Sequence, residues 1–337
     1  MNKYERIKTA VDNGIPDQVP YAFWTHLPGI DMNPEKLAEA TYDFYCEYDL
    51  DFIKMMNNGM YGAECYGCEI DNSEVLSGGV SKIVSTPVMT PKDWGQIEPL
   101  SLNNPVLMRE QRALELVLKK IKGKNVPVIF TVFSPLTVAD KISGKKVVEH
   151  IKSGYVKEVK NGLEAIAQTM AQLTHRVIEM GADGVFFATQ YASYDKVSSE
   201  FYAEYGKPWD LEVLAAAKDG WFNTLHAHGK NIMFELLKDY PVSVFNWHVG
   251  ESLPTMPEAH DLTGKCLMGG LERMDITNRH KNELYHEIYN AILSSGGRHL
   301  ILTPGCVMRY PLDKEMLAFV KKAKDEVESA LRRNHRI

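Results

Sequence analysis

The feature that most constrains the fold is a series of short apolar runs that alternate with helical stretches along the 337-residue chain. Runs that are apolar throughout predict strands buried on both faces, because a strand with one face in water would alternate apolar and polar residues. Strand–helix alternation of this kind is typical of a parallel sheet. The predicted strands cover residues 19–26, 51–56, 126–133, 184–190, 222–228, 242–248, 266–272 and 299–305.

Helix signals fill the gaps between these runs. Pro34 follows Asn33, a pair typical of a helix start. Apolar residues recur at helical spacing over 163–177, and Gly181 supplies a stop. Eight strand–helix units predict an α/β fold, a single-domain (β/α)₈ TIM barrel over residues 1–337. An open doubly wound sheet is the alternative, weakened because no Gly-x-Gly-x-x-Gly follows the first strand.

Composition narrows the classes of partner. The net charge of −6 and the pI near 6.0 argue against nucleic acid or an acidic membrane surface. Five cysteines, an odd number without framework spacing, fit a reducing compartment. The N-terminus has no apolar signal-peptide core, and no stretch reaches the roughly 18 to 20 apolar residues of a membrane span. We therefore expect a cytoplasmic protein.

Polar residues end nearly every predicted strand. In a TIM barrel such positions are typical of catalytic and binding groups. The seventh strand is the exception, because its ending offers only Glu272. The fifth and sixth strands end in histidine, and so does the first. The candidates that this pattern selects are His26, Asn57, Gln190, His226, His228, Asn246, His248 and Cys306.

A metal site is one reading of these residues. His226 and His228 are one residue apart, so in a strand both side chains lie on the same face. With Cys306 as a third ligand, two nitrogens and one sulfur suit tetrahedral zinc with an open fourth position. The alternative is one buried, hydrogen-bonding histidine and one in a loop. Cys65 and Cys68 form a Cys-x-x-Cys without a second pair, which favours two unrelated thiols on a turn.

Several segments resemble the uroporphyrinogen decarboxylase superfamily. Residues 297–306 are similar to its closing strand and loop, and residues 225–229 to its Leu-His-x-Cys-Gly segment. Residues 268–270 resemble its Met-Gly-Asn turn, and residues 133–137 its Pro-x-Thr-Leu segment. The likeness spans most of the chain and implies a TIM barrel.

One branch of this superfamily decarboxylates uroporphyrinogen without a cofactor. It holds substrate carboxylates with an Arg-x-x-x-Arg pair after the first strand, but this chain has no arginine between Arg6 and Arg109. Asn57 replaces that branch's catalytic aspartate, and Cys306 stands where it has a histidine. These departures favour the other branch.

The other branch consists of zinc methyltransferases that move methyl groups to or from a corrinoid (cobalamin) protein. Some of its members ligate zinc with His-x-Cys and a distant Cys. By resemblance, His226 matches that histidine and Cys306 the distant cysteine, while His228 replaces the middle cysteine. Zinc accepts imidazole in place of thiolate. The resemblance thus implies zinc, a corrinoid protein, a small-molecule methyl donor or acceptor, and a homodimer.

The main hypothesis is a zinc-dependent methyltransferase with His226, His228 and Cys306 as ligands. Its other expected residues are His248 and His26 as catalytic groups and Asn57, Gln190, Asn246 and Arg309 as substrate-binding groups. If His228 points away, His248 takes its place. The alternative is a cofactor-free decarboxylase of a tetrapyrrole or another carboxylic acid, with Lys54, Lys141 and Arg309 as available cations. A third hypothesis is a non-enzymatic corrinoid-binding protein.

Overall fold

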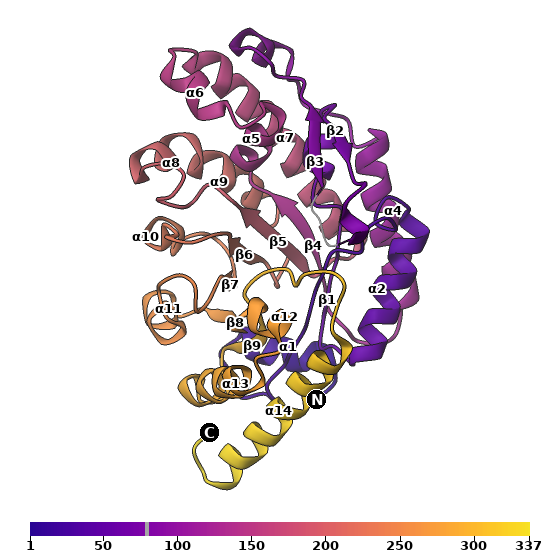
Figure 1. Cartoon of the computed structure of the whole chain (residues 1–337), viewed down its shortest axis with the longest axis vertical. Coiled ribbons are helices and arrows are strands. Elements are labelled where there is room, and N and C mark those ends of the chain that lie inside the picture. The colour runs from indigo at the N-terminus through magenta and orange to yellow at the C-terminus, as the bar shows by residue number, and fades with distance from the viewer. Residues whose placement is uncertain (78–80) are drawn as a thin grey trace.

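A parallel sheet forms the centre of the molecule. The structure, a computed structural model, describes residues 1–77 and 81–337. Seven parallel strands pair in the order β1-β4-β5-β6-β7-β8-β9. Figure 1 shows them curling into a half-barrel with helices on the outside. The strands are β1 Ile53–Lys54, β2 Glu69–Asp71, β3 Lys82–Ser85, β4 Val128–Phe133, β5 Gly184–Thr189, β6 Thr224–Ala227, β7 Val244–Trp247, β8 Cys266–Leu271 and β9 Leu300–Pro304.

Helices connect successive strands and cover the outer face of the sheet. The helices are α1 Lys3–Val11, α2 Pro34–Tyr48, α3 Tyr61–Glu64, α4 Pro105–Lys120, α5 Pro135–Ile142, α6 Val147–Lys152, α7 Val156–Met180, α8 Ser199–Tyr205, α9 Lys207–Ala215, α10 Phe234–Leu237, α11 Met256–Thr263, α12 Arg273–Asn278, α13 Lys281–Ser295 and α14 Lys314–Arg333. Two of them confirm their sequence signals. The Asn33 side chain accepts a hydrogen bond from the Lys36 N–H at the start of α2, and α7 ends at Gly181 with φ of 112°.

The first predicted strand, residues 19–26, is not a regular strand. It makes isolated bridges, one of them between Tyr21 and Leu302. Pro20 has no N–H to donate, and the Tyr21 N–H donates instead to the Asp51 carboxylate at 2.9 Å. The segment still lies beside β9, because the Leu302 N–H donates to the Pro20 carbonyl at 2.8 Å. The prediction of eight regular strands in a closed barrel is therefore replaced by seven strands in a half-barrel.

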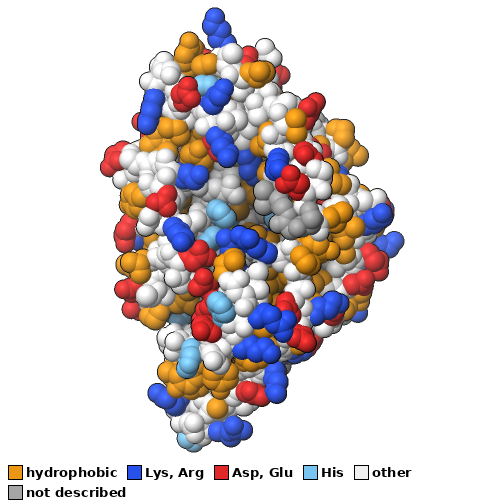
Figure 2. Space-filling view, in the orientation of Figure 1, with side chains coloured by type: hydrophobic (Ala, Val, Ile, Leu, Met, Phe, Trp, Pro, Cys, Tyr) orange, Lys and Arg blue, Asp and Glu red, His pale blue; other side chains and the backbone are white. Residues whose placement is uncertain are grey.

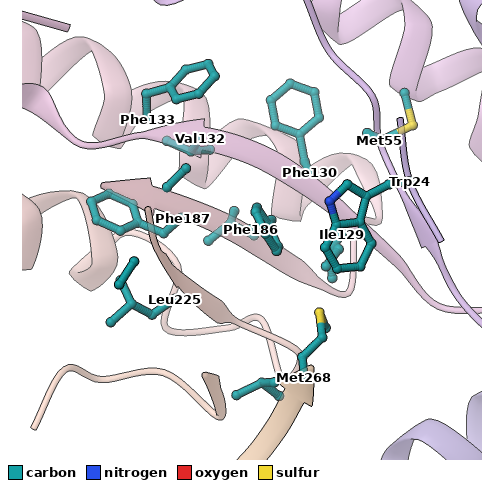
Figure 3. Close-up of a cluster of buried hydrophobic side chains, with 14 of the residues drawn as sticks. Trp24, Met55, Ile129, Phe130, Val132, Phe133, Phe186, Phe187, Leu225 and Met268 are labelled. Carbon is teal, nitrogen blue, oxygen red and sulfur yellow. The ribbon is translucent and has the colours of Figure 1, made fainter. Parts of the chain in front are cut away.

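The interior of the sheet is packed with large apolar side chains, as Figure 3 shows. Every residue of β4, β5 and β8 is buried. Phe186 of β5 points inward, where Trp24 packs against it edge-on with ring centroids 5.7 Å apart. The neighbouring Phe187 is also fully buried. Burial on both faces explains why the apolar runs predicted the other seven strands.

The excursion predicted between residues 59 and 100 contains an antiparallel pair, β2 with β3. Residues 78–80 of that excursion lie outside the described residues. Among the helices that the structure describes, none has the length and apolar character needed to cross a membrane. Because all seven main strands are parallel, their carboxyl ends open on one side of the sheet, and the loops there carry the candidate site.

Candidate metal centre and adjoining cavity

Three histidines and one cysteine meet at the carboxyl ends of β6, β7 and β9. His226 lies on β6, His228 directly follows β6, His248 directly follows β7, and Cys306 follows β9. One ligand atom from each lies within 4.8 Å of all the others. Nδ1 of His228 is 3.5 Å from Sγ of Cys306 and 3.3 Å from Nε2 of His248. The structure thus brings together the three predicted ligands and adds His248 as a fourth donor; these four residues are called the His/Cys group below.

Asn246 of β7 sets the tautomer of His226. Its Nδ2 donates to the carbonyl of Met268 at 2.8 Å, which turns Oδ1 toward His226 Nδ1 at 2.5 Å. Because that oxygen can only accept, Nδ1 of His226 carries the proton. Nε2 therefore keeps its lone pair, and it lies 3.7 Å from Sγ of Cys306. An imidazole held in this way by a second hydrogen bond is the usual arrangement of a metal-ligating histidine.

Burial controls the protonation of the His/Cys group. Desolvation is the largest cause that lowers the pKa of His228 and of His248 to about 4, and it holds the pKa of His226 well below the usual value. All three imidazoles are therefore neutral at pH 7, the form that binds metal. Burial raises the pKa of the Cys306 thiol, so without a metal the sulfur keeps its proton. A bound cation would displace that proton, because the thiolate is the ligand.

Lys54 of β1 lies inside the half-barrel close to this group. Its Nζ donates to Oγ1 of Thr131 at 3.0 Å and sits 4.4 Å from the centroid of the Phe186 ring. Desolvation lowers the pKa of Lys54 to about 7, while the charge of Cys306 raises it. Within the described part of the chain, no carboxylate pairs with Lys54. A thiolate at Cys306 would therefore be a favourable counter-charge.

A cavity of about 410 Å³ lies near the His/Cys group, although none of the four residues is among its described lining. Val307, the residue after Cys306, lines the cavity, and so does Arg273, whose charge acts on His228, His248 and Cys306. Figure 2 shows the cavity as a hollow with histidine side chains at its floor and Lys and Arg side chains around it. Three predicted residues, His26, Gln190 and Arg309, line this cavity. Desolvation lowers the pKa of His26 to about 4, helped by the charges of Lys54 and Lys141, so His26 is neutral at pH 7.

Asn57, predicted to bind substrate, lies in a buried network beside the cavity. Its Nδ2 donates to Oε2 of Glu110 at 2.9 Å. Arg109 donates to Glu110 at 2.9 Å and to Glu64 at 2.7 Å. Burial raises the pKa of Glu110 to about 7. Asn57 is absent from the described lining of the cavity, and its binding role stays a prediction. Asn246 contacts His226, as described above, and its own binding role also stays a prediction.

Cys65 and Cys68 are free and buried. Desolvation raises the pKa of Cys65 to about 12 and that of Cys68 to about 11, so both are neutral thiols at pH 7. This environment is the reverse of that of a reactive cysteine, whose pKa is lowered.

Sequence reasoning missed two charged residues of the cavity, Arg273 and Asp31. Arg273 directly follows Glu272, at the strand end that looked least polar, so reading one residue further would have found it. Its charge lowers the pKa of three members of the His/Cys group. Asp31 lies in the loop before α2 and accepts a hydrogen bond from Asn58 at 3.1 Å. Selecting polar residues at the ends of predicted strands does not include residues of that loop.

The fold and the site together define an α/β protein with a curled parallel sheet and a His/Cys group at its strand ends. The chain belongs to the uroporphyrinogen decarboxylase (URO-D) family, whose model matches residues 24–327. Two curated relatives carry the name methylcobamide:CoM methyltransferase MtbA. The one from Methanosarcina mazei is 23% identical over 59% of this chain and 56% of its own length. The one from Methanosarcina acetivorans is 21% identical over 85% of this chain and 81% of its own length.

Solved structures support the fold. A methyltransferase from Methanosarcina mazei superposes with a TM-score of 0.84 at 18% identity, over 97% of this chain and 99% of that one. This likeness confirms the α/β fold with a curled parallel sheet. The sequence predicted this sheet as a closed barrel of eight strands, whereas the structure has seven strands in a half-barrel.

Proposed function

We propose that this protein is a zinc-dependent methyltransferase that moves a methyl group between a small substrate and a corrinoid protein. The observation that carries the proposal is the His/Cys group, whose four ligand atoms lie within 4.8 Å of one another. Asn246 holds His226 in the tautomer that binds metal. The two relatives named methylcobamide:CoM methyltransferases support a corrinoid as the methyl carrier.

The residues present fit zinc. His226, His228 and Cys306 offer two nitrogens and one sulfur, a donor set that leaves a fourth position for substrate. When bound, zinc would lower the pKa of a substrate thiol, water or alcohol or polarise a substrate oxygen. His226 is fixed by Asn246, and Cys306 lies 3.5 Å from His228.

His248 is suited to accept a proton beside the fourth position. It is neutral at pH 7, because burial lowers its pKa to about 4. Its Nδ1 lies 3.5 Å from Oε1 of Glu251, which would stabilise the positive charge formed when Nε2 takes a proton. A corrinoid partner would supply the methyl group and keep the electron pair of the broken bond, and His248 would accept the proton of the acceptor thiol.

The three predicted residues that line the cavity would bind substrate from its walls. His26 and Gln190 present neutral donors and acceptors, and Arg309 presents a charge. Lys54 balances the charge of a thiolate at Cys306 from inside the half-barrel. Each of these groups acts on binding or charge without bonding to the transferred carbon.

The test combines metal content with turnover. Untagged protein should carry about one zinc per chain, and Cys306→Ala and His226→Ala should lose it. The exposed Cys46, changed to Ala, is the matched control and should keep the metal. Metal-loaded protein should demethylate methylcobalamin in the presence of a thiol, followed by the absorbance of the corrinoid. Protein without metal that is fully active would refute the proposal.

A cofactor-free decarboxylase remains the second candidate, since one observation favours it. Lys141, Arg273 and Arg309 line the cavity, and cations of this kind hold carboxylates. This reading requires release of CO₂ from a carboxylic acid by metal-stripped protein at the full rate. If removal of the metal abolishes turnover, the cofactor-free decarboxylase is excluded and the methyltransferase proposal stands.

A further inference from the structure

A buried aspartate lies on the helix side of the sheet. Asp210 of α9 is 0% exposed, and within the described part of the chain no lysine, arginine or histidine pairs with it. Figure 1 shows α9 outside the sheet. Burial raises the pKa of Asp210 to about 6, which leaves the carboxylate mainly ionised at pH 7. A buried charge without a cation is costly, and groups kept at such a cost cluster at functional sites.

Two tyrosines bind one oxygen of this carboxylate. The hydroxyl of Tyr202, on α8, donates to Oδ2 of Asp210 at 2.5 Å, and the hydroxyl of Tyr240 donates to the same oxygen at 2.9 Å. The other oxygen, Oδ1, is buried without a hydrogen-bond partner among the described residues. Each tyrosine hydroxyl has one proton, so the Tyr202 oxygen can only accept in its second contact. It accepts from Oγ1 of Thr189, 2.9 Å away.

Thr189 is the last residue of β5, and its side chain lies on the face of the helices. Successive strand residues alternate between faces. Because Phe186 points into the half-barrel, Thr189 points outward, toward Tyr202. The main chain of Thr189 meanwhile faces the next strand, where its carbonyl accepts the N–H of His228 at 2.9 Å. Thr189 is therefore held by Tyr202 on one side and holds the backbone of His228 on the other.

His228 depends on this anchor, because the chain turns directly after it. Gly229 has a φ of 98°, and a Cβ at this position would meet no atom within 4 Å. Nδ1 of His228 lies 3.5 Å from Sγ of Cys306 and 3.3 Å from Nε2 of His248. Metal–ligand distances are fixed to within about 0.2 Å. A shift of the β5 end would move the His228 backbone and change the distances on which metal affinity depends.

We propose that the hydrogen-bonded chain Asp210–Tyr202–Thr189 is a positioning device for the metal ligand His228, with Tyr202 as its central residue. The inference rests on the proposed function, because its consequence is the affinity of the His/Cys group for zinc. None of the three residues is among the described lining of the cavity. Tyr240 shares the carboxylate but has no described hydrogen bond to Thr189, so it stands outside the device.

The test compares the two tyrosines. Tyr202→Phe keeps the ring and removes the hydroxyl that joins Asp210 to Thr189. It should weaken zinc binding about tenfold, the lower end of the effect of losing a hydrogen bond that supports a ligand. Competition with a zinc-binding chromophore measures this affinity. Tyr240→Phe is the matched control, because it removes a hydroxyl from the same carboxylate oxygen and leaves Thr189 bonded. It should keep the zinc affinity within about twofold, although both variants should lower the urea midpoint.

Thr189 tests the same hydrogen bond from its other end. Thr189→Val removes the hydroxyl and should weaken zinc binding as much as Tyr202→Phe does. Thr189→Ser keeps the hydroxyl and should retain the affinity. The double variant, Tyr202→Phe with Thr189→Val, should bind zinc no more weakly than either single variant, because both changes remove one and the same bond. Losses that add in the double variant would refute the proposed chain. If Tyr202→Phe does not fold, the comparison of Thr189→Val with Thr189→Ser decides.

A measurement without metal separates this inference from the proposed function. The amide of His228 donates to the carbonyl of Thr189. In metal-free protein, hydrogen exchange of a peptide covering residues 225–229 should therefore be faster in Tyr202→Phe than in Tyr240→Phe. If this difference appears and no zinc binds, the positioning of His228 stands and the zinc assignment fails. If zinc binds and the two tyrosine variants have equal affinities, the positioning role is refuted and the zinc site survives.

Discussion

Lys54→Met should stabilise the metal-free protein at neutral pH. The lysine lies in the half-barrel without a carboxylate partner among the described residues, and desolvation lowers its pKa from 10.5 to about 7. A difference of this size between folded and unfolded states destabilises the fold by roughly 4 kcal/mol at pH 7, at about 1.36 kcal/mol for each pKa unit. The Lys54 side chain is not fully buried. We therefore expect about 2 kcal/mol, since partial solvent contact screens the effect.

The sign of the pH dependence follows from the lowered pKa. Between about pH 7 and pH 10.5 the unfolded chain binds the proton and the folded chain does not, so wild-type stability rises through this window. Methionine removes the proton, keeps the length of the side chain and leaves Oγ1 of Thr131 bonded to the Met55 carbonyl. The advantage of Lys54→Met should therefore be largest near pH 7 and vanish near pH 10.5.

Urea unfolding of metal-free protein across this pH range measures the effect. The exposed Lys119, changed to Met, is the control and should show no pH-dependent difference from wild type. A Lys54→Met variant that is no more stable than wild type at pH 7 would refute the reasoning. So would an advantage that is equal at pH 7 and pH 10.5, because packing alone would then explain it.

Asn246→Leu should weaken zinc binding about 10- to 100-fold, because His226 loses the acceptor that sets its tautomer. Competition with a zinc-binding chromophore measures this affinity. Asn246→Asp keeps an acceptor and should lose less of the affinity. Gly162→Ala should destabilise α7 by about 1–3 kcal/mol in urea unfolding, because the added Cβ would lie 2.4 Å from the ring of Trp94. Gly95 has open space around it, so Gly95→Ala should leave the stability nearly unchanged. The raised pKa of the Glu110 carboxyl makes wild type lose stability as the pH rises from about 4.5 to 7. Glu110→Gln should therefore become more stable relative to wild type over this window. Equal dependence of unfolding stability on pH in the two proteins would contradict this.

Much of the fold could be predicted because parallel strands covered on both faces are apolar throughout. That rule found β4 to β9 and the region of β1, and it failed for residues 19–26. There the apolar content is right, but Pro20 cannot donate and the Asp51 side chain takes the N–H of Tyr21. Whether a side chain accepts a hydrogen bond from a distant backbone N–H depends on the folded structure. Such a hydrogen bond leaves no periodic pattern in the sequence.

The site was predictable to the extent that it lies at strand ends. Converging strands explain why His226, His228 and Cys306 meet, and why His248 joins them from the next strand. Asn57 follows a strand but is drawn toward Glu110, a residue of α4 that no strand pattern includes. Asp31 comes from a loop, and only the folded chain places it in the cavity wall.

A site with four protein donors raises the question of how substrate would reach the metal, because closed tetrahedral sites are structural and catalytic ones keep a position open. The four donors are not equally held. His226 is fixed by Asn246, and Cys306 would be bound as a thiolate, the strongest donor of the four. His248 has a second partner in Glu251, 3.5 Å from its Nδ1. The proposed ligand set of His226, His228 and Cys306 leaves His248 as the donor that a substrate would displace, and Nε2 of His248 would then be free to accept the substrate's proton.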